Sequence, residues 1–206
     1  MKQAIIIFTK NLVYGQVKTR LAATIGNDMA LTVYQHLLQH TASVINDLPI
    51  DKIVFYSTSL EEQDLWNNEV YKKQLQTGND LGERMQNAFD YAFKQGNKEV
   101  AIIGTDCLEI TSAIIMNAFA YLKNNDVVIG PASDGGYYLL AMKQMHQPLF
   151  QNIEWSTNEV LKKTLAICTQ LNLAVHLLPQ LSDVDTEHDL SEEQKIMLQI
   201  NPVKND

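Results

Sequence analysis

The amino-acid sequence predicts an α/β protein with a mostly parallel β-sheet covered by helices on both faces. Short apolar runs of strand length alternate along the 206 residues with longer amphipathic segments of helix length. Several of these runs are apolar at nearly every position, which is typical of strands buried on both faces of a parallel sheet. We expect residues 1–190 to form a single domain and residues 191–206 to form a polar C-terminal tail.

Six apolar runs and the short segment at residues 74–77 are candidate strands. They comprise residues 4–8, 53–56, 74–77, 100–103, 127–129, 137–142 and 175–178. The first long helix is expected over residues 28–46, where apolar side chains recur at helical spacing. Three further helices follow the third, fourth and sixth of these candidates, so that strands and helices alternate along most of the chain.

Polar residues mark the starts of these three helices. Asp80 and Glu83 have the spacing of a capping box, in which each side chain accepts a hydrogen bond from the backbone N–H of the other residue. Thr111 is a candidate N-cap for the next helix. Ser156 and Glu159 form a second candidate capping box before an amphipathic segment.

The overall charge and the cysteine content exclude several classes of function. The net charge of −8 disfavours nucleic acids and anionic membranes as partners, although a local group of cations can still bind a small anion. The apolar run at residues 4–8 is too short for a signal peptide or a membrane span. Cys107 and Cys168 have neither a zinc-site nor a disulfide pattern, so we expect free thiols in a reducing cytoplasm.

The first candidate site is a basic loop between the first strand and the first long helix. Gly15 permits a tight turn, Lys18 and Arg20 supply two positive charges, and a helix N-terminus after Thr19 adds to them. Such a loop can hold a diphosphate, but two solvated loop cations are an equally good interpretation. The loop is not a P-loop, because Val17 precedes the lysine where that motif requires glycine.

The second candidate is Asp106, which follows the apolar run at residues 100–103. A carboxylate at a strand end suits Mg²⁺, which prefers oxygen ligands and often takes one or two carboxylates together with substrate phosphates. A helix cap or a turn is the alternative role for this aspartate, but Thr111 already serves as a cap. We expect the adjacent Cys107 to be a buried structural thiol rather than a nucleophile.

The third candidate is the glycine-rich segment at residues 130–138. Gly135 and Gly136 allow close approach of the backbone to a ligand, but the Asp134–Gly135 pair is also a strong hairpin signal. The hairpin interpretation is slightly favoured on local grounds. We expect Tyr137 and Tyr138 to pack in the core.

The fourth candidate is the acidic segment at residues 183–189. Alternate residues of an extended segment share a face, so Asp183 and Asp185 can point the same way and hold a cation between them. Helix capping by Thr186 together with Asp189 is an equally good interpretation.

The four segments together resemble a bacterial glycosyltransferase-like family of the DUF2064 type, grouped with GT-A nucleotide-diphospho-sugar transferases. The resemblance runs from about residue 4 to residue 190. It rests on the motifs at residues 15–21, 104–107, 130–140 and 183–186, of which the third is the most specific. The segments at 15–21 and 183–186 also resemble those of phospholactate guanylyltransferases, and a more distant likeness is to molybdenum-cofactor guanylyltransferases.

The resemblance implies a GT-A-like three-layer sandwich and a metal-dependent transferase that uses a nucleotide-diphospho-sugar donor and a small-molecule acceptor. It implies Asp106 and Asp185 as ligands of Mg²⁺ or Mn²⁺. The residues implied at the nucleotide phosphates are Gly15, Lys18, Thr19, Arg20, Gly135 and Gly136. Lys18 is also a candidate catalytic residue, with Asp134 on the acceptor side.

A nucleotidyltransferase is the alternative function, joining a nucleoside triphosphate to a phosphorylated small molecule with release of pyrophosphate. The Lys18–Leu21 stretch favours it, whereas the lack of a Gly-Gly-rich triphosphate loop disfavours it. A non-catalytic nucleotide-binding module is a third possibility.

The sequence departs from the family at Leu12, Tyr14 and Leu108, where prolines are usual, so the loop geometry need not be identical. The base, the sugar, the acceptor and the oligomeric state stay open.

Overall fold

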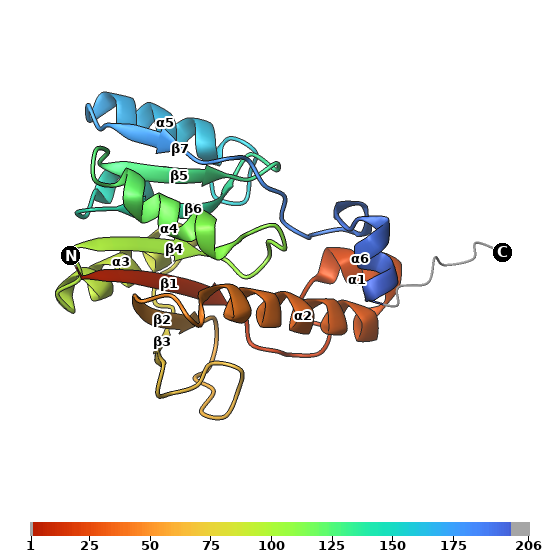
Figure 1. Cartoon of the computed structure of the whole chain (residues 1–206). Helices are drawn as coiled ribbons and strands as arrows, with labels where there is room; N and C mark the ends of the chain where they lie inside the picture. Colours follow the sequence, from red (N-terminus) through yellow and green to blue (C-terminus); the bar gives the residue numbers. More distant parts are fainter. Residues whose placement is uncertain (1, 199–206) are drawn as a thin grey trace.

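A computed structural model of the chain describes residues 2–198 and contains one seven-stranded sheet in the order β3-β2-β1-β4-β6-β5-β7 (Figure 1). The strands are β1 (Gln3–Thr9), β2 (Asp51–Tyr56), β3 (Tyr71–Leu75), β4 (Glu99–Ile103), β5 (Val127–Pro131), β6 (Tyr137–Met142) and β7 (Val175–Leu177). The α-helices are α1 (Thr19–Ile25), α2 (Asn27–Ile45), α3 (Leu81–Lys94), α4 (Ser112–Tyr121), α5 (Val160–Gln170) and α6 (Glu192–Met197). Two 3₁₀ helices, η1 (Gln147–Phe150) and η2 (Glu187–Asp189), complete the described elements.

The sheet is mostly parallel, which confirms the fold class expected from the sequence. β1 pairs in parallel with β2 and β4, β2 pairs in parallel with β3, and β5 does so with β7. Strand β6 runs antiparallel to both of its neighbours, because a hairpin joins it directly to β5. The start of β6 therefore lies at the same edge of the sheet as the carboxyl ends of the other strands.

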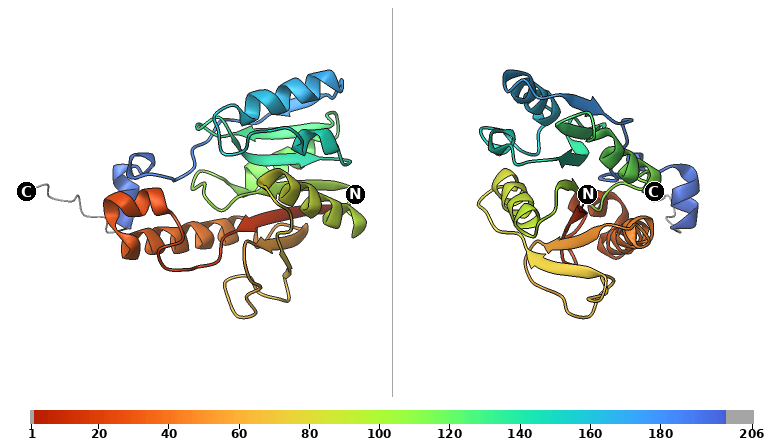
Figure 2. Two further views of the ribbon diagram at one scale, coloured as in Figure 1. Left: turned by 180° about the vertical axis from the view of Figure 1, so that it is seen from behind. Right: turned by 60° about the vertical axis from the view of Figure 1, so that its left-hand side comes forward.

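Two apolar layers lie on opposite faces of the sheet. Ile5 and Ile7 of β1 pack on the side of α2 and α4, whereas Ala4 and Ile6 pack on the side of α3 and α5. This alternation follows from the two-residue repeat of a strand, and it explains why the run is apolar throughout. Figure 2 shows the helices on the two sides of the sheet, which gives the predicted three-layer arrangement.

Two of the expected helix starts differ from the structure. Asp80 caps α3 by accepting from the Glu83 N–H at 2.8 Å, but the Glu83 carboxylate bonds to the Asn79 N–H instead of completing a capping box. The predicted box at Ser156 and Glu159 is wrong, because Ser156 has a positive φ of 63° and α5 begins at Val160 without a side-chain cap. Thr111 does cap α4, as expected.

The remaining differences concern short elements. The third strand spans Tyr71–Leu75 rather than residues 74–77, and its side chains lack a long apolar run. The helix after the basic loop is the separate α1, which Gly26 divides from α2 with a φ of 81°. Figures 1 and 2 show α6 beside α1, so the stretch expected as a polar tail begins with a helix; residues 199–206 lie outside the described part. Among the described helices, none has both the length and the apolar character that a membrane crossing needs.

Candidate functional site

A cleft of about 710 Å³ opens along the carboxyl ends of the strands. Its walls include Lys10 after β1, the segment 104–106 after β4, and Tyr137 at the start of β6. The strand order 3-2-1-4 reverses direction between β1 and β4, so this cleft lies at the switch point where open α/β sheets bind ligands. All four predicted motifs contribute residues to the cleft, and the glycine-rich segment contributes Asp134, Gly136, Tyr137 and Tyr138.

Lys18 lies between two of the predicted acidic residues. Its ammonium Nζ is 2.8 Å from Oδ1 of Asp106 and 3.3 Å from Oδ1 of Asp185. The Lys18 side chain is only 5% exposed. Burial alone would lower the pKa of Lys18, but the two carboxylates outweigh it and hold the pKa above its ordinary value. Lys18 is therefore a fixed positive charge inside the cleft.

The backbone at Lys18 is unusual for a non-glycine residue, with φ 48° and ψ 44° in the left-handed region. This conformation costs free energy and recurs at functional sites. Lys18 directly precedes α1, so its side chain turns back into the cleft while Thr19 and Arg20 form the first turn of the helix.

Arg20 and Thr19 complete the basic end of the cleft. Nη1 of Arg20 lies 3.3 Å from Oδ2 of Asp185, and the guanidinium is largely exposed. Asp185 therefore contacts both cations of the loop, one with each carboxylate oxygen. Gly15 adopts the positive φ of 71° expected of a tight turn, but it lies outside the residues that line the cleft.

Asn11 anchors the start of the basic loop. Its side-chain carbonyl accepts a hydrogen bond from the Thr58 hydroxyl at 2.8 Å, and its amide donates to the Ser59 carbonyl and the Glu61 carboxylate. These bonds tie the loop to the segment after β2. They restrain the entry to the loop without a proline at Leu12 or Tyr14.

The acidic segment is joined to Asp106 through the backbone. The N–H of Val184 donates to the carbonyl of Asp106 at 2.8 Å. Asp183 and Asp185 line the cleft, whereas Val184 is buried and lines a second cavity of about 260 Å³. The two aspartates therefore share a face, as predicted from the alternation of an extended segment.

Asp183 carries the strongest electrostatic perturbation of the acidic residues. Burial, together with the negative charges of Asp106, Asp134 and Asp185, raises the pKa of its carboxyl to about 7. The positive charge of Lys18 opposes this shift. The sequence pointed to Asp183 as a neighbour of Asp185, but its burial and the approach of Asp134 depend on the folded chain.

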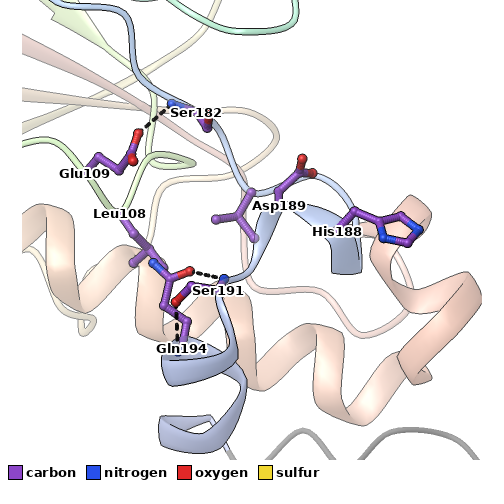
Figure 3. A pocket seen from close by; sticks show the side chains of 8 residues that line it. Leu108, Glu109, Ser182, His188, Asp189, Ser191 and Gln194 are labelled. Atoms are coloured by element: carbon purple, nitrogen blue, oxygen red, sulfur yellow. Dashed lines mark hydrogen bonds between the residues drawn. The ribbon is translucent and has the colours of Figure 1, made fainter.

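The second cavity lies between the segment after β4 and the start of α6 (Figure 3). Its polar groups bond to one another: the Glu109 carboxylate accepts from the Ser182 N–H, and Gln194 accepts from the Ser191 N–H. The nearby Asp189 accepts from the backbone N–H groups of Asp185 and Thr186. The capping role considered for Asp189 is therefore present beside the site, and it holds the segment of Asp185 in place.

The predicted hairpin forms between β5 and β6. The Asp134 carboxylate accepts from the Gly136 N–H at 2.8 Å and lines the cleft together with Gly136. Gly135 has a φ of 89° and lies so close to the Asn158 backbone that a Cβ atom would collide with it. Of the two glycines, Gly136 faces the cleft, while Gly135 permits the hairpin to dock on the segment before α5.

Tyr138 and Cys107 are buried, as expected, whereas Tyr137 is only partly buried. The Tyr138 hydroxyl donates to the Pro179 carbonyl, and burial raises the pKa of the Cys107 thiol to about 12. Both tyrosines also contribute to the cleft wall. A thiol held in its protonated form is a poor nucleophile, so Cys107 has a structural role.

Several cleft residues escaped the sequence analysis. Arg84 of α3, Gln76 after β3 and Trp155 line the cleft beside the predicted groups. Arg84 donates through Nε to the Gly78 carbonyl, and Gln76 donates to the Phe55 carbonyl at the end of β2. No local motif marks these residues, because their positions depend on contacts between separate elements.

The carboxylates that contact Lys18 and Arg20 are candidate ligands of a divalent metal. Asp106 and Asp185 offer hard carboxylate oxygens, and both already contact one cation, the Lys18 ammonium. Within residues 2–198, no three histidine, cysteine, aspartate or glutamate side chains are arranged as a complete metal site. The pair therefore fits a metal that takes its remaining ligands from phosphate and water.

Comparison with solved structures identifies the fold. A candidate nucleotide-diphospho-sugar transferase from Desulfovibrio desulfuricans G20 is 32% identical to this chain, with a TM-score of 0.82, and the match covers 90% of this chain and 84% of the other. The fold and this match define a transferase of the nucleotide-diphospho-sugar transferase fold.

A family model described as "Uncharacterized protein conserved in bacteria (DUF2064)" matches residues 37–157, which is more than half of the chain. The protein belongs to this family. No curated protein matches the sequence.

Two more distant structures share the fold. The inositol-1-phosphate CTP transferase from T. maritima is 11% identical, with a TM-score of 0.57, and the match covers 97% of this chain and 95% of that one. The protein Rv0371c from Mycobacterium tuberculosis H37Rv, solved in complex with manganese, is 11% identical with a TM-score of 0.56, covering 92% and 96% of the two chains.

Proposed function

We propose that this protein is a metal-dependent transferase that uses a nucleotide-diphospho-sugar donor. The observation that carries the proposal is the contact of one buried lysine, Lys18, with both Asp106 and Asp185 at the carboxyl ends of the strands. The cations of the cleft suit a negatively charged diphosphate, and its carboxylates suit a divalent metal ion.

The basic end of the cleft would bind the two phosphates of the donor. Lys18 and Arg20 supply positive charge, and Thr19 lies in the first turn of α1, where backbone N–H groups lack partners within the helix. Because Lys18 is buried and keeps its proton, its charge is available at the leaving diphosphate throughout the physiological pH range. This stabilises the negative charge that develops when the bond between sugar and phosphate breaks.

Asp106 and Asp185 would hold Mg²⁺ or Mn²⁺, and the metal would neutralise part of the diphosphate charge. The manganese bound by Rv0371c supports this choice of metal at the level of the shared fold. With a metal present, the Lys18 ammonium no longer needs to balance both carboxylates and can turn to the phosphates.

Asp134 also lines the cleft and would orient the hydroxyl group of the acceptor or accept its proton. One carboxylate oxygen is held by the Gly136 N–H, which fixes the orientation of the group. The close docking of Gly135 on Asn158 stabilises the hairpin that carries Asp134.

A nucleotidyltransferase is the second candidate function. The shared fold of the inositol-1-phosphate CTP transferase favours it, and so does the cluster of Lys18 and Arg20, which suits a triphosphate as well. In that case the product would include pyrophosphate rather than a nucleoside diphosphate.

The deciding experiment measures both products in two parallel incubations. The purified protein is incubated with Mn²⁺ and nucleotide sugars, or with Mn²⁺, nucleoside triphosphates and sugar phosphates. Release of a nucleoside diphosphate supports the first function, and release of pyrophosphate supports the second. If no nucleotide or nucleotide sugar binds saturably in the presence of Mg²⁺ or Mn²⁺, both proposals are wrong.

We also propose the cytoplasm as the location of the protein. The support for this is chemical: Cys107 and Cys168 are both buried free thiols, which suits a reducing compartment.

A further inference from the structure

We propose that Trp155 forms the wall of a sugar-binding subsite in the same cleft, beyond the phosphate-binding end. This inference rests on the proposed function, because it assigns a place to the sugar of the transferred or accepting group. It adds Trp155 and the polar segment at 156–158, which line the cleft outside the four candidate-site segments, and Gly82, which contacts Trp155.

The position of Trp155 is fixed by a glycine in α3. A Cβ atom on Gly82 would lie 2.5 Å from Nε1 of the indole and 2.6 Å from the Phe150 carbonyl. Gly82 is therefore the reason that the indole can lie directly against the first turn of the helix. Glycine is a poor helix former, so its presence in α3 is consistent with a requirement for this close contact.

Apolar side chains line the cleft together with the indole. Met85, one turn along α3 from Gly82, and Tyr137 of β6 both line the cleft, and Tyr137 and Trp155 pack against the apolar cluster that contains Met85. Tyr137 contacts the Met85 sulfur through its hydroxyl at 3.9 Å. Trp155 is only partly buried, so one part of the ring packs on α3 while another part contributes to the cleft wall.

The polar groups beside Trp155 are neutral. Ser156, Thr157 and Asn158 follow the tryptophan directly and line the cleft. The hairpin that carries Asp134 docks on Asn158, and Asp134 and Arg84 of α3 also line the cleft. The cleft therefore has a charged end with Lys18 and Arg20, and an aromatic end where Trp155 adjoins the hydroxyl and amide side chains of residues 156–158.

This division matches a ligand with two chemically different parts. The charged end suits phosphates, and the aromatic end suits a ring that has an apolar C–H face and several hydroxyl groups at its edge. Aromatic side chains supply a large apolar surface, and neutral hydroxyl and amide groups supply hydrogen bonds without a net charge. A sugar ring meets both requirements. A nucleobase is the competing occupant of the aromatic end, and the experiment distinguishes the two.

The test compares each nucleotide sugar with its own nucleoside diphosphate. The dissociation constants of UDP-glucose and UDP, and of GDP-mannose and GDP, are measured by calorimetry with Mn²⁺ for the wild type and for Trp155→Ala. Tyr121→Ala is the matched control, because Tyr121 is a half-exposed aromatic residue outside the cleft. The difference in tryptophan fluorescence between wild type and Trp155→Phe reports ligand contact with the indole, since the other tryptophan, Trp66, is buried away from the cleft.

The proposal predicts that Trp155→Ala weakens binding of at least one nucleotide sugar by about tenfold, which is a typical loss for a stacked ring. Binding of the parent diphosphate should change less than about twofold. Equal weakening of sugar and diphosphate would assign Trp155 to the nucleobase and overturn the sugar subsite. Unchanged binding of both would show that the indole contacts neither. Failure of the wild type to bind any of the four ligands would instead contradict the proposed function, and the subsite with it.

Discussion

The ammonium of Lys18 lies between Asp106 and Asp185, 2.8 Å from the first carboxylate and 3.3 Å from the second. These three residues come from the loop before α1, from the end of β4 and from the segment after β7. The lysine therefore occupies the position between the two carboxylates that we propose as metal ligands. A metal bound there would compete with the ammonium for the same oxygens.

Lys18→Met should change metal binding and nucleotide binding in opposite directions. Without the ammonium, the two carboxylates lose their balancing charge, so Mn²⁺ alone should bind more tightly, by about tenfold. Nucleoside diphosphate binding should weaken, because the phosphates lose a buried cation. Calorimetry with each ligand measures both effects. Lys162→Met is the control, since Lys162 pairs with Glu159 on the surface of α5. Weaker binding of Mn²⁺ by Lys18→Met would contradict the competition.

Asp106→Asn should remove the part of nucleotide binding that depends on the metal. The amide keeps the size of the side chain but lacks the negative charge that a divalent ion requires. We expect the stabilisation by nucleotide with Mn²⁺ to fall to the level seen with nucleotide and a chelator, as measured by thermal unfolding. Asp90→Asn in α3, outside the cleft-lining residues, is the matched control. A full Mn²⁺ effect in Asp106→Asn would remove Asp106 from the metal site.

Gly82→Ala should lower the free energy of unfolding, although alanine favours helices. The added Cβ would meet the indole of Trp155 and the Phe150 carbonyl, and the backbone oxygen cannot move aside easily. Overpacking of this kind costs about 1–3 kcal/mol, which exceeds the helix propensity gained. Urea unfolding measures the change. Gly104→Ala is the control, because a Cβ there meets no atom within 4 Å. Equal or greater stability of Gly82→Ala would show that Trp155 is free to shift.

His146 should make the fold less stable at acidic pH. Burial lowers the pKa of its imidazole below the ordinary value, against a smaller opposite effect of Asp126, and Nε2 has no hydrogen-bond partner among the described residues. The imidazole therefore binds a proton more readily in the unfolded chain. The free energy of unfolding falls as the pH drops through the pKa of the unfolded histidine, which is about 6.5.

His146→Gln should reduce this loss of stability between about pH 7.5 and pH 5.5, a window set by the unfolded pKa. The free energies of unfolding of the two proteins, measured across that range, provide the comparison. His36→Gln on the partly exposed side of α2 is the control. Parallel pH curves for wild type and His146→Gln would show that His146 contributes nothing to the acid sensitivity.

Much of the fold could be predicted from the sequence because strands that are buried on both faces are apolar at nearly every position. The segment at residues 4–8 is apolar throughout, and it forms β1, an interior strand of the sheet. β3 at the sheet edge was misplaced, because Lys72 and Lys73 interrupt its apolar character. The cap expected at Ser156 was wrong because the contacts between Asn158 and the β5–β6 hairpin, rather than local capping, determine the backbone there.

The candidate site was predictable only in its separate parts. Lys18 and Asp106 stood out because each follows a strand, and ligands collect where parallel strands end. Their distance from one another, and the approach of Asp183 to Asp134, depend on how the sheet brings distant segments together. Trp155 and Gly82 carried no signal, because a contact between two residues so far apart in the sequence leaves no local pattern.

The pairing of Lys18 with Asp185 joins residues that are 167 positions apart. During synthesis on the ribosome, the early strands β1, β2 and β3 can pair with one another well before Asp185 leaves the exit tunnel. The nascent chain therefore passes through a stage in which Lys18 has been made but lacks one of its two carboxylates. Full ligand affinity can arise only after Asp185 has joined Lys18, so a nucleotide would stabilise the folded domain far more than the precursor that still lacks Asp185.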